Sequence, residues 1–308
     1  MPDNCRSSRS SLRALGASIL ALAALACSDS SGPNSPAPLV DARIVAFSST
    51  AGNSNGLSIY LMHADGSSKT RLTSEGFLDE SPVWSPDGSF IAFDTNRDPA
   101  GIWVVGADGS DPHPYITSST LSQPSGIAWS PDGSNIAVTA RVDTIFAIFV
   151  ADASGSNAHR LTANVHGEQR PSWSPDGTMI AFEARDDQSS DTHIFVIGAD
   201  GTGQLQLTSA AFDGGARWSP DGSQLVFDRH TNPGIQVFVM NADGSNQHAL
   251  TTSGANFGAA WSPDGQQFEH TVIRNNQNQI SRMNADGSDV RLITTTGTNA
   301  FPAWKPTP

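Results

Sequence analysis

Trp84-Ser85-Pro86-Asp87-Gly88 is the first of five identical pentapeptides in this 308-residue chain. A sixth tryptophan, Trp304, follows the fifth copy by 43 residues, although Lys305-Pro306 stands there in place of Ser-Pro. The five copies begin 43 to 45 residues apart, at Trp84, Trp129, Trp173, Trp218 and Trp261. A fixed period of this length is typical of repeat proteins, in which each repeat is one supersecondary unit. The chain is therefore expected to be a set of repeats and not two ordinary domains of about 150 residues.

A second motif, Ala-Asp-Gly, recurs with the same period between the tryptophan positions. Five identical copies and one looser copy occupy residues 64–66, 107–109, 199–201, 242–244, 285–287 and 151–155. In Ser-Pro-Asp-Gly, proline sets φ for the first central position of a tight turn, and glycine accepts the left-handed geometry that returns the chain. Both motifs therefore predict turns, with short apolar strands such as Phe90–Phe93 and Ile102–Val105 between them.

Two turns per repeat leave room for four strands, which is the make-up of a propeller blade. The first repeat, starting at Arg43–Phe47, has no tryptophan strand, whereas Phe301–Trp304 is a tryptophan strand without a repeat of its own. We therefore expect an all-β fold, a six-bladed β-propeller of four-stranded blades, closed by the C-terminal strand Phe301–Trp304 pairing with the N-terminal blade. In the sixth blade the second strand, Gln267–Ile273, lacks the usual Ile-Ala-Phe pattern, and we expect it to be distorted or shifted in register.

The paired Trp-Ser-Pro-Asp-Gly and Ala-Asp-Gly motifs resemble the repeats of the TolB-like β-propeller family over about residues 41–304. This resemblance implies the same fold and a face at the mouth of the central channel that binds a protein partner. The periplasmic protein TolB has an additional N-terminal α/β domain, where this chain has a short tether. The resemblance therefore implies the propeller domain and not the full role of TolB.

The N-terminal segment has the pattern of an export signal. Arg6, Arg9 and Arg13 form a positive region before the apolar run Ala14–Ala26. That run is too short to span a bilayer comfortably as a helix, which favours a signal peptide over a membrane anchor.

Ala24-Leu25-Ala26-Cys27 resembles a lipobox, in which the cysteine is lipidated and becomes the mature N-terminus. The alternative is an ordinary secretory signal that is cleaved nearby. We expect an exported protein of the periplasm or cell surface, lipid-anchored to a membrane. Its predicted parts are a signal peptide at 1–26, lipidated Cys27 with a disordered tether at 27–40, and the propeller at 41–308.

Charge and cysteine content exclude several function classes. The net charge is −13, and an acidic surface repels phosphate backbones, so we expect no nucleic-acid binding. Because Cys5 and Cys27 are the only cysteines, residues 41–308 have no disulfide, thiol nucleophile or cysteine zinc site. We expect a monomer.

A binding site is expected where the blades differ, because the repeated turn aspartates and the tryptophans have structural roles. The positions five residues before the tryptophans hold three acids, two amides and Pro124. Together with one neighbouring acid, they give the candidate binding residues Asp79, Glu80, Glu168, Asp213, Asn256 and Asn299. The resemblance places them near the channel entrance, where a convergent ring would attract a cation or a basic peptide segment. We expect no cofactor, with Ca²⁺ at this mouth as the alternative. The competing interpretation is that these residues cap turns and hydrogen-bond neighbouring blades.

No catalytic constellation is recognisable in the sequence, and the eight histidines show no paired spacing of metal ligands. We therefore expect a non-enzymatic protein-binding or scaffold propeller of the bacterial cell envelope, whose partner is an envelope protein or glycan. The alternative is a metal-dependent glycan-active or hydrolytic enzyme that uses the channel mouth, because such a mouth can combine residues that are distant in sequence.

Overall fold

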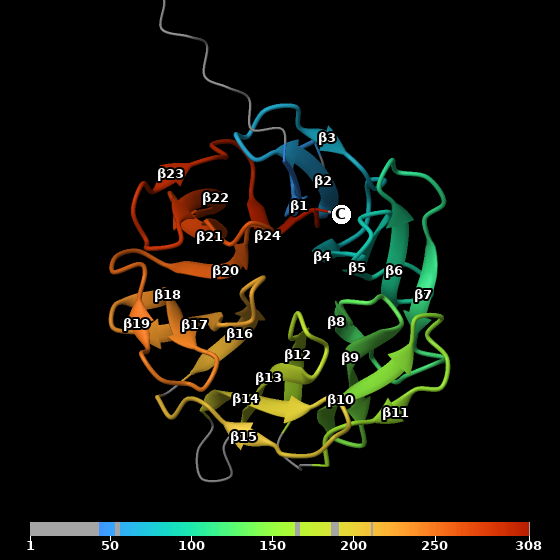
Figure 1. Ribbon diagram of the computed structural model, residues 1–308. Coiled ribbons are helices and arrows are strands. Elements are labelled where there is room, and N and C mark those ends of the chain that lie inside the picture. Colours follow the sequence, from blue (N-terminus) through green and yellow to red (C-terminus); the bar gives the residue numbers. More distant parts are fainter. Residues whose placement is uncertain (1–42, 53–55, 164–166, 186–190, 211, 308) are drawn as a thin grey trace, which may run out of the picture. The chain divides into compact units, whose positions relative to one another are not determined.

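The computed structural model describes residues 43–52, 56–163, 167–185, 191–210 and 212–307. Within them the chain forms six four-stranded antiparallel sheets, arranged around a central channel as the blades of a propeller (Figure 1). The predicted all-β, six-bladed fold is thus confirmed. None of the described residues forms a helix with the length and hydropathy of a membrane span. The expected signal peptide at 1–26, and Cys27 with the tether at 27–40, lie outside the described residues.

Each blade is a meander of four strands that runs from the channel to the rim. The inner strands of blades 1 to 6 are β24 (Asn299–Trp304), β4 (Asp79–Trp84), β8 (Ser125–Trp129), β12 (Glu168–Trp173), β16 (Asp213–Trp218) and β20 (Asn256–Trp261). The second strands, in the same order, are β1 (Ile44–Ser49), β5 (Phe90–Thr95), β9 (Asn135–Val142), β13 (Met179–Arg185), β17 (Gln224–Thr231) and β21 (Gln267–Arg274). The third strands are β2 (Ser58–His63), β6 (Gly101–Gly106), β10 (Ile145–Asp152), β14 (Thr192–Gly198), β18 (Gly234–Asn241) and β22 (Gln277–Asn284). The outer strands are β3 (Thr70–Arg71), β7 (His113–Thr117), β11 (His159–Arg160), β15 (Leu205–Gln206), β19 (His248–Ala249) and β23 (Arg291–Leu292).

The Trp-Ser-Pro-Asp-Gly segments form the turns between the inner and second strands. In blade 2, Gly88 has a φ of 67° and its N–H donates to Ser85 O at 2.8 Å. Asp87 accepts hydrogen bonds from Ser85 Oγ at 2.6 Å and from Ser89, and these bonds lower the pKa of Asp87 to about 2. The turn aspartate therefore stabilises its own turn, as predicted, and is not positioned for catalysis.

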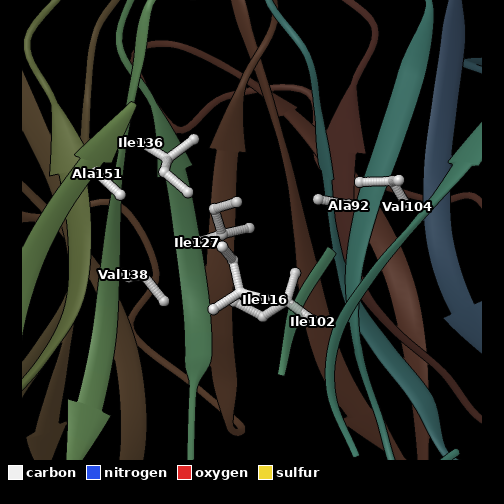
Figure 2. Close-up of a cluster of buried hydrophobic side chains, with 8 residues drawn as sticks. All are labelled: Ala92, Ile102, Val104, Ile116, Ile127, Ile136, Val138 and Ala151. Carbon is white, nitrogen blue, oxygen red and sulfur yellow. The ribbon is translucent and has the colours of Figure 1, made fainter. Parts of the chain in front are cut away.

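The hydrophobic core lies between neighbouring blades. One cluster combines Ala92, Ile102, Val104 and Ile116 of blade 2 with Ile127, Ile136, Val138 and Ala151 of blade 3 (Figure 2). Trp84 and Trp304 are only 6% and 7% exposed and belong to such clusters, which confirms that the tryptophans contribute to the core between blades. Because each blade buries both faces against its neighbours, the ring has to close.

The ring closes where β24 pairs antiparallel with β1, so that Trp304 lies opposite Val45 and Asn299 opposite Ser49. This pairing confirms the predicted closure, and β24 begins two residues before the predicted strand. Cations flank the seam: the Arg43 guanidinium lies 4.7 Å from the centre of the Trp304 ring. The Asp-Gly turn of blade 1 completes the junction, because a Cβ at Gly66 would lie 2.7 Å from Ile293 O of blade 6.

The second strand of blade 6 is regular, so the prediction of a distorted or shifted strand was wrong. β21 pairs with β22 over its full length, and Phe268 lies opposite Trp261 of β20, as Ile91 lies opposite Trp84 in blade 2. Tight turns at both ends of β21 hold the register: Gly265 N–H donates to Ser262 O before the strand, and Asn275 and Asn276 have positive φ after it. The unusual sequence instead places His270 in the core at 1% exposure, where burial lowers its pKa to about 4.

Candidate binding site in the central channel

The acids predicted to form a binding ring are the first residues of their inner strands, but their side chains are buried inside the blades. Asp79 is 0% exposed and accepts hydrogen bonds from Thr95 at 2.6 Å and from Arg97 at 2.5 and 3.1 Å. Asp213, also 0% exposed, accepts two hydrogen bonds from Arg229 at 2.6 and 2.8 Å. Both carboxylates are thus neutralised within their own blade.

The remaining members of the predicted ring are also buried and bonded. Asn299 accepts from Ser49 Oγ at 2.8 Å and donates to Gln279 of blade 6 at 3.2 Å. Asn256 donates to Ser253 O at 2.8 Å, and Glu168 accepts from the Thr162 hydroxyl at the end of blade 3. These contacts correspond to the competing interpretation, in which the residues cap turns and join neighbouring blades.

The channel itself encloses a cavity of about 920 Å³, and Glu80 is the one member of the predicted set among its lining residues. Most of its lining residues belong to the inner and second strands of the blades. Groups that differ from blade to blade line it, among them Glu80, Gln169, Arg170, Arg217, Phe257 and Phe301. The cavity wall therefore varies from blade to blade, and it contains other residues than the ones first predicted.

A ring of hydrogen bonds joins consecutive blades along this cavity. In each inner strand, the residue three positions before the tryptophan has a φ between 53° and 65°. Its N–H donates, over 2.9 to 3.3 Å, to a second-strand side chain of the preceding blade. The six acceptors are Ser48, Asp94, Thr139, Glu183, Asp228 and Thr271. Three acids thus lie on the cavity wall at positions where the other blades have hydroxyls.

Two of these acids are protonated in part at neutral pH. Burial raises the pKa of Asp94 to about 7, and the neighbouring Glu80 adds to the rise. Burial likewise raises the pKa of Asp228 to about 7, although Arg170 and Arg217 act in the opposite direction. The charge on the channel wall therefore changes across the physiological pH range.

Several polar groups of the cavity are not used within the described structure. Neither Glu80 nor Gln169 forms a hydrogen bond with another described residue through its side chain. Arg217 donates one hydrogen bond, to Ala216 O at 3.1 Å, and Arg170 contacts Glu183 at 3.3 Å. These groups have remaining capacity to bind a ligand, in contrast to the buried residues of the predicted ring.

Aromatic side chains cover another part of the wall. The Phe257 and Phe301 rings meet edge to face, with centroids 6.1 Å apart. Phe212, which is 42% exposed, lies 5.7 Å from the His230 ring, and both also line the cavity. Apolar and charged groups therefore share one enclosed space.

Metal ligation is not supported by the geometry of the described residues. Among them, no group of three or more His, Cys, Asp or Glu side chains is arranged to hold a metal ion. Calcium at the channel mouth therefore stays a prediction without an identified set of ligands.

Comparisons with known proteins agree with this architecture. A family model described as the TolB beta propeller domain matches residues 26–212 and 185–308. TolB from Acinetobacter baumannii superposes with a TM-score of 0.76 at 20% identity, over 88% of this chain and 68% of that chain. A TolB-type protein from Agrobacterium tumefaciens gives 0.68 at 21% identity, over 84% and 90%. An oligogalacturonate lyase in complex with manganese gives 0.58 at 15% identity, over 82% and 73%. No curated protein sequence matches the chain, and at these identities the solved structures show a shared fold alone.

Proposed function

The chain belongs to the TolB β-propeller domain family, and from this premise we propose that it is a non-enzymatic protein-binding module of the bacterial cell envelope. The observation that carries the proposal is the channel cavity of about 920 Å³, which has unused polar groups beside exposed aromatic rings. Binding sites typically combine an apolar wall with a few polar groups that fix orientation. The partner is an envelope protein whose segment enters the channel.

The location in the envelope rests on the N-terminal sequence. Arg6, Arg9 and Arg13 precede an apolar run that ends at Cys27, which is the pattern of an exported lipoprotein. We propose that lipidated Cys27 holds the propeller at a membrane surface, where it acts as a monomer. Acyl chains in pairs give stable anchoring, whereas one chain gives only marginal binding.

The alternative, a metal-dependent glycan-active or hydrolytic enzyme, finds less support. An oligogalacturonate lyase in complex with manganese shares the fold of this chain, and at 15% identity the likeness shows the fold alone. The described residues of this chain contain no cluster of three or more side chains that could hold a metal ion. The unused groups of the cavity are suited to recognition, because no nucleophile and base among them are hydrogen-bonded to each other.

Capture of partners from envelope extracts tests the proposal. Gln169→Trp adds a bulky ring at the channel mouth, and Val290→Trp adds the same ring at a position near the rim that is 57% exposed. We expect the proteins recovered with the wild-type chain to be lost with Gln169→Trp and retained with Val290→Trp. Equal recovery with all three proteins would show that the channel does not bind the partner.

A further inference from the structure

The charges around the cavity are unevenly distributed. Blade 2 contributes Glu80 and Asp94, whereas Arg170 and Arg217 come from blades 4 and 5. Blade 5 is the third blade from blade 2 in either direction around the ring, and β4 and β16 face each other across the channel in Figure 1. Glu183 and Asp228 lie beside these arginines, so an acidic wall stands opposite a wall in which arginine and carboxylate groups are mixed.

The acidic wall is suited to an organic cation. Glu80 lies in β4, next to β24 of blade 1, which contributes Phe301 to the cavity. Phe301 contacts Phe257 edge to face, with an angle of 64° between the rings. A carboxylate and aromatic rings that line the same cavity from neighbouring strands attract an ammonium or guanidinium group, the first by charge and the second by the cation–π interaction. A lysine or arginine side chain fits this combination.

The opposite wall is suited to a carboxylate. Arg217 uses one N–H group in its bond to Ala216 O, and a guanidinium has five N–H donors in a planar fork. Arg170 uses one N–H group in its contact with Glu183, and Glu183 and Asp228 also accept the backbone N–H groups of Gly215 and Gly258. Donors on Arg170 and Arg217 therefore remain for a carboxylate on a ligand.

The backbone around the channel favours a peptide as the ligand. All six inner strands are the edges of their sheets, so apart from the N–H group that each donates to the preceding blade, their outward main-chain groups pair with no other strand. Edge strands of this kind can bind the main chain of an extended peptide, while pockets for side chains give specificity. The cavity of about 920 Å³ lies near the upper end of the range for ligand sites.

We propose that the channel binds an extended peptide segment that carries both a basic side chain and a carboxylate. The basic group lies between Glu80 and the Phe257–Phe301 pair, and the carboxylate binds Arg170 and Arg217. This assignment rests on the proposed protein-binding function, because it states the chemistry of the partner segment.

Selection from random octapeptides tests the assignment. The full chain, Glu80→Lys, Arg217→Gln and the control Glu75→Lys are each presented with two N-acetylated libraries, one with free and one with amidated C-termini. Glu75 is a matched control because it is exposed, pairs with Arg71 and lies outside the cavity. Circular dichroism and the melting temperature of each variant establish that it is folded. Preference for the free C-terminus identifies the carboxylate as terminal, and acidic residues enriched in both libraries identify it as a side chain.

We expect the wild-type chain and Glu75→Lys to enrich peptides with a basic residue together with a carboxylate. Glu80→Lys should reduce affinity for the selected basic peptides by about 10- to 100-fold, the range expected for a lost charge-assisted hydrogen bond. Arg217→Gln should remove the preference for the carboxylate. Enrichment of neutral peptides would overturn this assignment and leave the protein-binding function standing. No enrichment, or enrichment that Glu80→Lys does not change, would also overturn it. The protein-binding function is tested separately by the capture experiment. It would fail if Gln169→Trp recovered the same envelope proteins as the wild-type chain.

Discussion

Asp79 and Glu80 are adjacent acids, but the structure predicts that replacing the carboxylate by an amide destabilises the fold at Asp79 and hardly affects it at Glu80. Asp79→Asn and Glu80→Gln each replace a carboxylate by an amide of nearly the same shape. Asp79 is buried and bonded to Arg97, whose side chain is 9% exposed, whereas Glu80 lines the cavity. The comparison therefore separates a structural acid from a binding acid within two residues of one strand.

The expected loss for Asp79→Asn follows from the buried ion pair. The substitution leaves the Arg97 guanidinium without its counter-charge, 4.1 Å from the centre of the Phe77 ring. Removing one partner of a buried pair costs about 3–5 kcal/mol. A loss of about 3 kcal/mol corresponds to a melting temperature lower by roughly 6–12 °C in a domain of this size. Glu80→Gln should change the free energy of unfolding by less than about 0.5 kcal/mol, as is usual for a side chain without such a partner.

Urea denaturation at pH 7.5, followed by tryptophan fluorescence, measures both free energies on the full chain. Thermal melts followed by circular dichroism provide the second estimate. Equal stability of the Asp79→Asn and wild-type proteins would refute the structural role of Asp79. A Glu80→Gln protein as unstable as Asp79→Asn would show that Glu80 also supports the fold.

Four further predictions concern pH, the core, the seam and the anchor. The pKa values of Asp94 and Asp228 are about 7 in the folded state, above the ordinary value of 3.8. Between these two values the folded state binds more protons than the unfolded state. The contribution of these two acids to the free energy of unfolding should therefore fall from about pH 4 to pH 7 and level off above pH 7. Asp94→Asn with Asp228→Asn should remove this fall in urea titrations and leave the rise between about pH 4 and 6.5 that the lowered pKa of His270 contributes, and an unchanged fall would contradict the assignment. His270→Phe introduces the residue type that blades 1, 2, 4 and 5 have at this buried position. Because it removes a buried polar ring, it should raise the free energy of unfolding by about 1–2 kcal/mol. A less stable variant would argue for a specific role of His270. Deleting residues 299–308 removes β24 and should abolish cooperative melting; a melting temperature equal to that of the wild type would rule out the closure. Cys27→Ser should eliminate labelling by radioactive palmitate in growing cells, and retained label would place the acyl chain elsewhere.

The blade architecture was predictable because it follows from local rules. Trp-Ser-Pro-Asp-Gly forms the same turn wherever it occurs, and its period specifies where each strand begins. The closure by β24 also followed from the sequence, because one repeat lacked a strand that the C-terminal segment could supply. The register of β21 was predicted wrongly, because its unusual side-chain pattern was given more weight than the tight turns on either side of it.

The lining of the channel was less predictable, because it depends on the direction of each side chain. Asp79 has its partner Arg97 in the loop after β5, and Asp213 has Arg229 near the end of β17. The sequence contained a signal for this pairing: the two acids have an arginine 16 to 18 residues later, and the amides Asn256 and Asn299 have a glutamine 20 residues earlier. Comparing blades position by position would have exposed these pairs. The cavity residues Arg170 and Arg217 required the structure, since nothing in the repeat indicates which side chains face the axis.

Site-specific photo-crosslinking tests whether the channel binds a partner segment through the side chains that differ from blade to blade. A photoreactive phenylalanine analogue is placed at Gln169, in the cavity wall, or at Val290, near the rim, and cells are irradiated. We predict a discrete adduct to an envelope protein from position 169 that is lost when Glu80→Lys is added, and no adduct of the same mass from position 290. An identical adduct from both positions, or an adduct from position 169 that Glu80→Lys does not affect, would contradict this prediction.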